Sequence, residues 1–595
     1  MMTNVIDKDQ QWLLNCLSAT LDPNQELRSF AEASLHQASL QPGFGTALSK
    51  VASNRELPLG LRQLAAVLLK QFIKKHWEEG DDSFEHPAVS SDEKAVIRRL
   101  LLFSLDDSHK KICTAISMAV ASIAVYEWPE NWPDLLPFVL KLISDQTNMN
   151  GVHGALRCLA LLSGDLDDKM VPALVPVLFP CLLTIVSSHQ VYDKYIRAKA
   201  TSIVYSCASV LGAMGGVYKT ESTALIGPML KSWMDQFSII LEEPVQPEDP
   251  DDWSLRMEVL KCLNQFAQNF PSLTESQFMV IVGPLWKTFE SSLTVYVRSS
   301  IEGTEDSYEG RYDSDGAEKS LDSFVIQMLE FLLTVVGSAK LVKFVANSVK
   351  EVVYHTIAFL QMTEQQVHTW SVDANQFVAD EDDVTYSCRV SGSLLLEEIV
   401  NTCGGEGIDA IMDAAKKRFN ESQQQKASGS TVWWRIREAT LFALASVSEQ
   451  LVELQVLEVT RVDVGNLLEQ IITEDIGIGV HECPFLYARI FTSIAKFTSV
   501  ISHGVLEQLL NAAIRAIGMD VPPPVKVGTC RALSQLLPEA NKETIRPQMM
   551  GLFHHLLIFL TKHLMRPCTW CLKHCKLQLG LTMNHRHPWS PSSLL

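Results

Sequence analysis

The sequence predicts an all-α protein, a HEAT- or armadillo-type superhelical solenoid built from repeated helix pairs. Apolar residues recur at the 3.6-residue period of a helix through most of the 595 residues, and the two-residue alternation of strands is rare. The breaks between these segments are short and rich in Pro, Asp, Asn and Gly. Two helices recur about every 40 residues, so the chain has room for about twelve or thirteen pairs.

The clearest helix is predicted over residues 57–77. Pro58 suits a first helical position, because its missing N–H would have no partner there. The apolar residues that follow share one face of a helix: Leu61, Leu64, Ala65, Leu68, Leu69, Phe72 and Ile73. Four basic residues lie off that face: Arg62, Lys70, Lys74 and Lys75. Such a helix needs neighbouring helices to cover its apolar side.

The other predicted helices follow the same design. Residues 8–21 form a first amphipathic segment, and Asp22-Pro23-Asn24 ends it and caps the next one, which carries Leu27, Phe30 and Leu35. Further helices are predicted at about 42–53, 91–105, 109–127, 133–146, 151–163, 171–187, 192–213, 222–242, 253–270, 274–292, 320–336, 339–361, 391–402, 405–420, 431–454, 463–474, 482–498, 501–517, 522–538 and 542–563.

Three acidic segments interrupt this pattern. Residues 242–252 hold six acidic residues and no basic one, residues 302–318 hold seven acidic residues against Arg311, and residues 373–390 include the run Asp380–Asp383. Blocks of like charge repel and stay solvated, so these segments are predicted to be interaction loops or plain disordered linkers between helices. The candidate contacts for a basic partner are Glu248, Asp249, Asp251, Asp252, Asp380, Glu381, Asp382 and Asp383.

The charge and composition narrow the partners. The formal charge of −19 and the lack of a basic stripe argue against a direct nucleic-acid partner. An acidic chain favours basic proteins as binding partners, although the acidity also increases solubility. The N-terminus shows no signal peptide, and no apolar window is long enough for a bilayer span. Most of the thirteen cysteines fall within helical apolar stripes, which predicts buried free thiols in a reducing compartment.

The sequence carries no recognisable catalytic motif. It lacks a Gly-rich phosphate loop, a His-Glu-x-x-His pair and a Gly-x-Ser-x-Gly elbow, so neither an enzyme nor a bound cofactor is predicted. An EF-hand would alternate oxygen ligands around a central Gly and close with a Glu. Asp313-Ser314-Asp315-Gly316 is only a fragment of that pattern, and no metal is predicted.

Residues 564–595 differ from the rest of the chain. They hold four basic residues, no acidic residue and three cysteines, and they lose the helical period. Cys568-x-x-Cys571 is half a zinc knuckle, but His585 and His587 are spaced too closely for the usual histidine pair. We predict a divergent, disordered tail, such as an alternative end that truncates the solenoid.

Several stretches resemble the importin-β (karyopherin-β) family. They are residues 57–77, the Trp-Pro/Trp-Pro turn within Tyr126–Pro137, and two later motifs, Phe377–Asp383 and Trp433–Ala439, which resemble one branch of the family. The resemblance implies importin N-terminal repeats over residues 1–105 and HEAT repeats over 106–563. A HEAT scaffold of another class, such as a phosphatase or kinase regulatory subunit, would share the solenoid without the Trp-Pro turn.

The resemblance implies a nuclear transport receptor that shuttles between cytoplasm and nucleus. Such receptors bind Ran–GTP through inner helices of the first repeats, which makes Arg62, Lys70, Lys74 and Lys75 the candidate Ran contacts. They touch Phe-Gly nucleoporins on the outer surface, and the branch resembled here implies basic cargo such as core histones and ribosomal proteins. Because full receptors are longer, the alternative is a truncated form that acts as a chaperone or scaffold for basic proteins without full transport activity.

Overall fold

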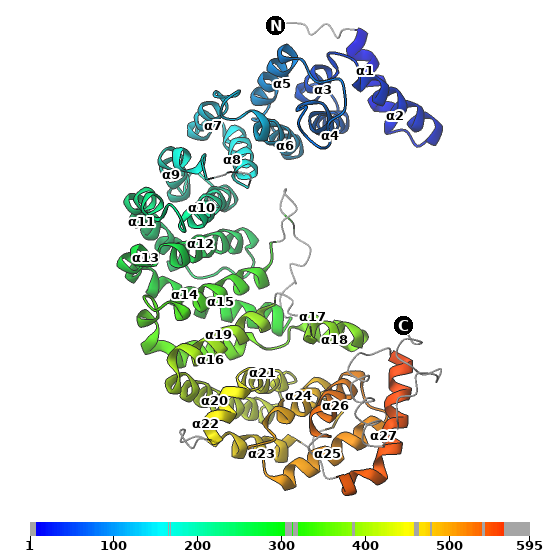
Figure 1. The fold of residues 1–595 in the computed structure, drawn as a ribbon, viewed down its shortest axis with the longest axis vertical. Helices are drawn as coiled ribbons and strands as arrows, with labels where there is room; N and C mark the ends of the chain where they lie inside the picture. Colours follow the sequence, from blue (N-terminus) through cyan, green and yellow to red (C-terminus); the bar gives the residue numbers. More distant parts are fainter. Residues whose placement is uncertain are drawn as a thin grey trace. The chain divides into compact units, whose positions relative to one another are not determined.

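The computed structural model describes residues 8–164, 166, 168–303, 312, 319–382, 387–456, 463–475, 479–537 and 542–563. These residues form 27 α-helices, which confirms the predicted all-α class (Figure 1). The chain divides into two compact units. Unit 1 comprises Met1–Leu241, Glu248–Ile281 and Tyr308–Ser320, and unit 2 comprises Glu242–Pro247, Val282–Ser307 and Leu321–Leu595.

Unit 1 contains the first thirteen helices. Their bounds are α1 Lys8–Thr20, α2 Gln25–Ser39, α3 Phe44–Ser53, α4 Leu59–His76, α5 Ser91–Phe103, α6 Lys110–Glu127, α7 Leu135–Ser144, α8 Met149–Ser163, α9 Val171–Ser187, α10 Lys194–Met214, α11 Lys219–Glu242, α12 Pro250–Asn269 and α13 Pro271–Gln277.

The helices of unit 1 pack as successive antiparallel pairs. The pairs α1/α2, α3/α4, α5/α6, α7/α8 and α9/α10 are each in contact, and α4, α6, α8, α10 and α12 also contact one another in turn (Figure 1). The helices α3 and α5, and likewise α7 and α9, contact each other in the other layer. Each helix thus covers the apolar face of its neighbours, which is the packing of HEAT repeats.

Unit 2 contains the remaining helices and four short 3-10 or π segments. Their bounds are α14 Met279–Tyr296, η1 Val297–Ile301, α15 Leu321–Gly337, η2 Val342–Phe344, η3 Ala346–Ser348, α16 Val349–Phe359, α17 Glu364–Val372, α18 Ala374–Asp382, α19 Cys388–Cys403, α20 Gly405–Ala427, α21 Trp433–Ser446, α22 Ser448–Val456, α23 Val464–Asp475, α24 Pro484–Ile494, η4 Ala495–Phe497, α25 His503–Gly518, α26 Pro523–Leu536 and α27 Lys542–His563.

Unit 2 repeats the two-layer design with one addition. The helices α15, α19, α21, α24 and α26 contact one another in turn, while α16 contacts α20 and α25 contacts α27 in the second layer. The helices α17 and α18 form a hairpin inserted between α16 and α19 (Figure 1). This hairpin also contacts η1 and α26, which are distant in sequence.

Side-chain caps start several of these helices. Asn24 accepts from the backbone N–H groups of α2, and Ser90 and Asp193 do so for α5 and α10. Thr363 and Gln366 form a reciprocal capping box at α17. Each cap satisfies an N–H that the helix itself leaves without a partner, so these short polar residues set where the helices begin.

The core is apolar, and its thiols are free. The two largest fully buried side chains are Trp77 and Trp233. All ten cysteines among the described residues are free, and seven of them are buried, in agreement with the prediction for this part of the chain. Among the helices described, none is long and apolar enough to cross a membrane.

The structure corrects some predicted boundaries. Only residues 349–359 of the helix predicted at 339–361 are α-helical, because two 3-10 turns precede them. The helix predicted at 431–454 breaks at Val447 into α21 and α22. The segment predicted as an acidic loop at 373–390 contains α18 over residues 374–382.

Candidate functional site

The basic residue nearest the start of α4, Arg62, is buried. Its side chain is 1% exposed. Its Nε donates to the carbonyl oxygen of Ala52, 3.1 Å away in α3, and its Nη2 pairs with the buried carboxylate of Asp107 in the turn between α5 and α6. Burial acts to raise the pKa of Asp107, but the hydrogen bonds from Arg62 and His109 hold it below its usual range. Arg62 therefore joins two repeats and offers no contact surface for a partner.

The three lysines of α4 lie nearer the surface. Lys74 is exposed, and Lys70 is half-buried. The Nζ of Lys75 lies 2.8 Å from the carboxylate of Glu85, and both side chains are about half exposed. The α4 surface that remains for a partner is thus formed by Lys70, Lys74 and Lys75.

A fixed acidic turn follows α4 directly. The hydroxyl of Tyr126 donates to Asp81 at 2.7 Å, and the hydroxyl of Ser83 donates to the same carboxylate. Hydrogen bonds from Ser83, and then from Tyr126, lower the pKa of Asp81 to about 2. The neighbouring acids Glu78, Glu79 and Asp82 are exposed. The sequence analysis missed this turn, although residues 78–85 hold five acidic residues and no basic one, which was the signal used elsewhere.

The Trp-Pro turn anchors α6 to two earlier helices. The buried Trp77 donates through Nε1 to Glu127 Oε1 at 2.9 Å, and Arg98 donates to the other oxygen of Glu127 at 2.5 Å. Trp132 is 5% exposed and lies under the guanidinium of Arg98. Glu127 and Trp132 therefore serve packing.

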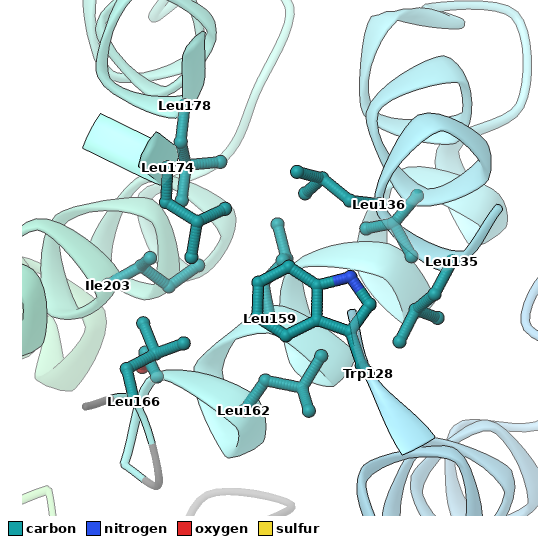
Figure 2. Close-up of a pocket in the computed structure, with 11 residues that line it drawn as sticks. Trp128, Leu135, Leu136, Leu159, Leu162, Leu166, Leu174, Leu178 and Ile203 are labelled. Carbon is teal, nitrogen blue, oxygen red and sulfur yellow. The ribbon is translucent and has the colours of Figure 1, made fainter. Parts of the chain in front are cut away.

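An apolar pocket opens between α7 and α9, beside Trp128 (Figure 2). It has about 360 Å³ of empty space, including its open mouth. The indole of Trp128 lies between the leucines of α7 and those of α9, with α8 beneath it (Figure 2). The side chains that line it are Trp128, Leu135, Leu136, Val139, Leu159, Leu162, Ser163, Leu166, Leu174, Leu178 and Ile203. Its lining presents an apolar surface at the opening between the two helices.

The predicted acids around α12 are largely engaged within the chain. Asp249 caps the helix, and its carboxylate and that of Asp252 lie 2.8 and 2.9 Å from Nζ of Lys194. Asp252 is buried and also accepts from Arg256 at 2.7 Å. Asp251 pairs with Lys319. Glu248 is exposed. Pro250 occupies the first position of the helix, where its missing N–H needs no partner.

Two predicted acids of α18, Asp380 and Glu381, are also engaged within the chain. Asp380 accepts from Trp370 Nε1 and from Gln376 Nε2, both at 2.7 Å. Glu381 lies within an ion cluster with three arginines. Asp382 ends α18, and its side chain and Asp383 lie outside the described residues, as do most of residues 302–318 and the whole tail with its Cys568-x-x-Cys571 motif.

The described residues hold no cluster of three or more His, Cys, Asp or Glu side chains that would bind a metal ion. The two tryptophans at the start of α21, Trp433 and Trp434, are each 8% exposed. Three features remain as candidate binding surfaces: the lysines of α4, the acidic turn beside them and the pocket at Trp128.

Comparisons with known proteins decide the family. Residues 31–107 match the importin-beta N-terminal domain, and residues 345–569 match the importin-9 central HEAT repeats. The chain is 25% identical to importin-9 of Drosophila melanogaster over 548 residues, which are 91% of this chain and 52% of that protein. The chain belongs to the importin-β family. Its members are nuclear transport receptors, which act as carriers rather than enzymes.

Two solved structures share the fold. Lph2, a bidirectional nuclear transport receptor of S. cerevisiae, gives a TM-score of 0.63 at 17% identity, covering 96% of this chain and 58% of Lph2. Kap121p bound to RanGTP gives a TM-score of 0.56 at 18% identity, covering 96% of this chain and 48% of Kap121p. The chain spans about half the length of the relatives that it matches.

Proposed function

We propose that the chain is a nuclear transport receptor, which binds Ran–GTP and a basic cargo protein and shuttles between cytoplasm and nucleus by contacting Phe-Gly nucleoporins. The observation that carries this proposal is the match of residues 31–107 to the importin-beta N-terminal domain, since that range includes α4 with its surface lysines. A structure of Kap121p, which has this fold, contains RanGTP.

The Ran contact would use the outward bases of α4. Lys74 is exposed, Lys70 is half-buried, and Lys75 forms an ion pair with Glu85. Arg62 is excluded from this surface by its burial against Asp107. Charged residues at the edge of an interface mainly set the association rate and its salt dependence.

The test measures Ran–GTP binding to the full chain with Lys70 and Lys74 both changed to Glu. We expect several-fold weaker binding and a smaller dependence on salt. The matched control is Lys50→Glu, because Lys50 is an exposed base on the neighbouring α3. Wild-type affinity in the α4 double variant would exclude this surface, and no Ran binding by the wild-type chain would refute the receptor function.

The cargo would be a basic protein, such as a core histone dimer or a ribosomal protein. The net charge of −19 supports such a partner, and Glu248 keeps its carboxylate exposed. The turn after α4 adds Glu78, Glu79 and Asp82 as exposed acids. The other predicted cargo residues near α12 are paired within unit 1, so we assign them to folding.

The cargo is tested by titrating the chain with a core histone dimer at increasing salt. We expect binding that weakens steeply with salt, and a further loss when Glu78, Glu79 and Asp82 are changed to Gln and Asn. Glu32, an exposed acid on α2, supplies the control Glu32→Gln. Histone affinity that ignores both salt and these substitutions would exclude an electrostatic cargo surface.

The apolar mouth of the pocket at Trp128 would contact the phenylalanine of a Phe-Gly nucleoporin. Its lining is apolar apart from Ser163, and it lies between successive helices of one layer. Leu162→Trp would fill the pocket and weaken binding of a Phe-Gly peptide, while Val217→Trp, at an 82%-exposed position, would not. Equal binding by both variants would place nucleoporin contacts elsewhere.

The second candidate function is a chaperone or scaffold for basic proteins. The chain spans about half the length of its relatives, so import is proposed separately from cargo binding. Nuclear accumulation of a fluorescent basic cargo in permeabilised cells separates the two functions. Import that depends on Ran supports the receptor, whereas cargo binding without import supports the chaperone.

A further inference from the structure

The hairpin formed by α17 and α18 reaches helices that are far from it in sequence. In a HEAT stack each repeat normally contacts only its neighbours. This hairpin leaves the stack after α16, contacts both η1 and α26, and returns to the stack at α19. It therefore adds contacts that skip several repeats of unit 2.

The last turn of α18 is fixed by Glu381. Arg489, in α24, donates to both of its carboxylate oxygens at 2.8 and 2.7 Å, across 108 residues of sequence. Arg389 in α19 and Arg531 in α26 approach the same carboxylate at 3.8 and 3.7 Å. The Glu381 side chain is 8% exposed. One residue of α18 thus contacts three helices of a single layer.

A second carboxylate completes this cluster. Glu438 in α21 is fully buried, and Arg389 donates to both of its oxygens at 2.9 Å. Arg489 donates its Nε to Glu438 at 2.7 Å. We name Glu381, Arg389, Glu438, Arg489 and Arg531 the ion cluster. Three arginines share two carboxylates, so the removal of Glu381 would leave a buried excess of positive charge.

Aromatic side chains also attach the hairpin to α24. The ring centroids of Trp370 and Phe377 lie 5.3 Å apart, and each lies near Phe485 of α24, at 6.1 and 5.7 Å. Phe485 in turn stacks on Trp434 of α21. Phe377 and Glu381 are one turn apart on α18, so the charged and apolar contacts lie on one face of the helix.

The start of α17 is fixed by a separate set of contacts. Glu364, the first residue of α17, pairs with Arg435 of α21. The Nη1 of Arg435 donates to the carbonyl oxygen of Ile301 in η1, 134 residues away in sequence. It also donates to the carbonyl oxygen of Met362 at 3.2 Å. Arg435 therefore links the start of the hairpin to η1.

We propose that the α17–α18 hairpin is a brace, which holds η1, α19, α21, α24 and α26 at fixed spacing and makes this part of unit 2 open as one cooperative block. A stack without such a brace can bend at each repeat, because only nearest-neighbour contacts oppose the motion. The brace rests on contacts within unit 2 and does not depend on the proposed transport function.

Hydrogen exchange on the full chain tests the brace through Glu381→Gln. We expect amide exchange in α17–α18 to become roughly 10- to 100-fold faster, and exchange in α24 and α26 to accelerate with it. The matched control is Asp413→Asn, which removes one negative charge from the exposed pair of Lys350 and Asp413, 2.9 Å apart in the same unit. Faster exchange confined to the hairpin would overturn the proposal.

A milder variant covers the case in which Glu381→Gln does not fold. Glu364 is 58% exposed, so Glu364→Gln should leave the fold intact. We expect several-fold faster exchange in η1 as well as in α17, since without Glu364 the guanidinium of Arg435 is held less firmly against Ile301. Unchanged exchange in η1 would show that the hairpin does not hold it, and would also overturn the proposal.

Discussion

The helices α4 and α18 carry charged runs that look alike in the sequence and are used differently in the fold. In α4, Arg62 is buried against Asp107, while Lys74 faces solvent. In α18, Asp380 bonds to Trp370 and Glu381 enters the ion cluster. A charged run on a helix in the main stack thus keeps an outward side, whereas in the inserted hairpin Asp380 joins α18 to α17 and Glu381 attaches α18 to the stack.

The cause of this difference is the number of neighbours. A stack helix is covered along one stripe, so charges a few positions apart differ in exposure by tens of percent. The hairpin lies across other helices, so α18 meets α24 and α26 with the face that carries its acids. The comparison teaches that a block of like charge in a solenoid insertion is as compatible with an internal attachment as with a free interaction loop.

The largest effect is expected at the centre of the ion cluster. Glu438→Gln would leave Arg389 and Arg489 without half of their buried countercharge, and should lower the free energy of unfolding of unit 2 by about 3–5 kcal/mol. The measurement is a urea titration, in which hydrogen exchange of the α21 amides reports the unfolding of unit 2. Asp235→Asn breaks the exposed pair with Lys231 and should cost less than about 1 kcal/mol. Similar losses in both variants would contradict a special role for the cluster.

The next effect concerns the buried base of α4. Arg62→Met would leave Asp107 buried without its main partner, at a cost of about 3 kcal/mol in unit 1. Arg55, which is 54% exposed and pairs with Asp106, supplies the control Arg55→Met, with an expected change below about 1 kcal/mol. If both substitutions lower the free energy of unfolding by the same amount, the buried Arg62 contributes no more to stability than an exposed arginine does.

A third buried acid gives a pH-dependent version of the comparison. Burial raises the pKa of Asp475 to about 6, although Arg437 lies 2.6 Å away, whereas the arginines around Glu381 overcome burial and lower its pKa to about 2. The stability contributed by protonated Asp475 is present below about pH 4 and is lost as pH rises through 6. The Glu381 contribution is present above about pH 4.5 and is lost only as pH falls toward 2.

We therefore expect the wild type to lose about 2–3 kcal/mol relative to Asp475→Asn between pH 4 and 7. The measurement is the free energy of opening of the α23 amides at several pH values. Parallel pH curves for the wild type and this variant would show that Asp475 ionises as an exposed acid does.

The smallest effect is expected at the outward bases of α4. Because Lys74 is exposed and no hydrogen bond or ion pair of its ammonium group is found among the described residues, Lys74→Ala should leave the thermal midpoint of the chain unchanged. A clear drop in the midpoint would mean that this lysine serves packing, and would remove the contrast with Arg62.

Periodicity predicted most of the helices, but not which of their charged side chains face solvent and which are buried. The helix predicted at 57–77 is observed at Leu59–His76, since its apolar stripe and Pro58 define it locally. The helix α18 was missed because Ala374–Asp382 is short and ends in acids, and its structure depends on Phe485 and Arg489, which lie about a hundred residues away. Contacts of that length are invisible to a local pattern.

The candidate site was predicted less completely than the fold. The basic run of α4 gave the right helix and included Arg62, whose burial depends on Asp107 in the next repeat. The acidic turn at residues 78–85 has the same charge signal as the three predicted segments and was not identified. The pocket at Trp128 depends on the spacing of α7 and α9, which no run of residues encodes by itself.

Three consecutive residues at the end of α6 each serve a different neighbour. Tyr126 bonds to the acidic turn, Glu127 to Trp77 and Arg98, and Trp128 lines the pocket. A substitution at any one of them shifts the backbone that places the other two. We expect these positions to change together during evolution, because the turn and the pocket inherit their geometry from the same three residues.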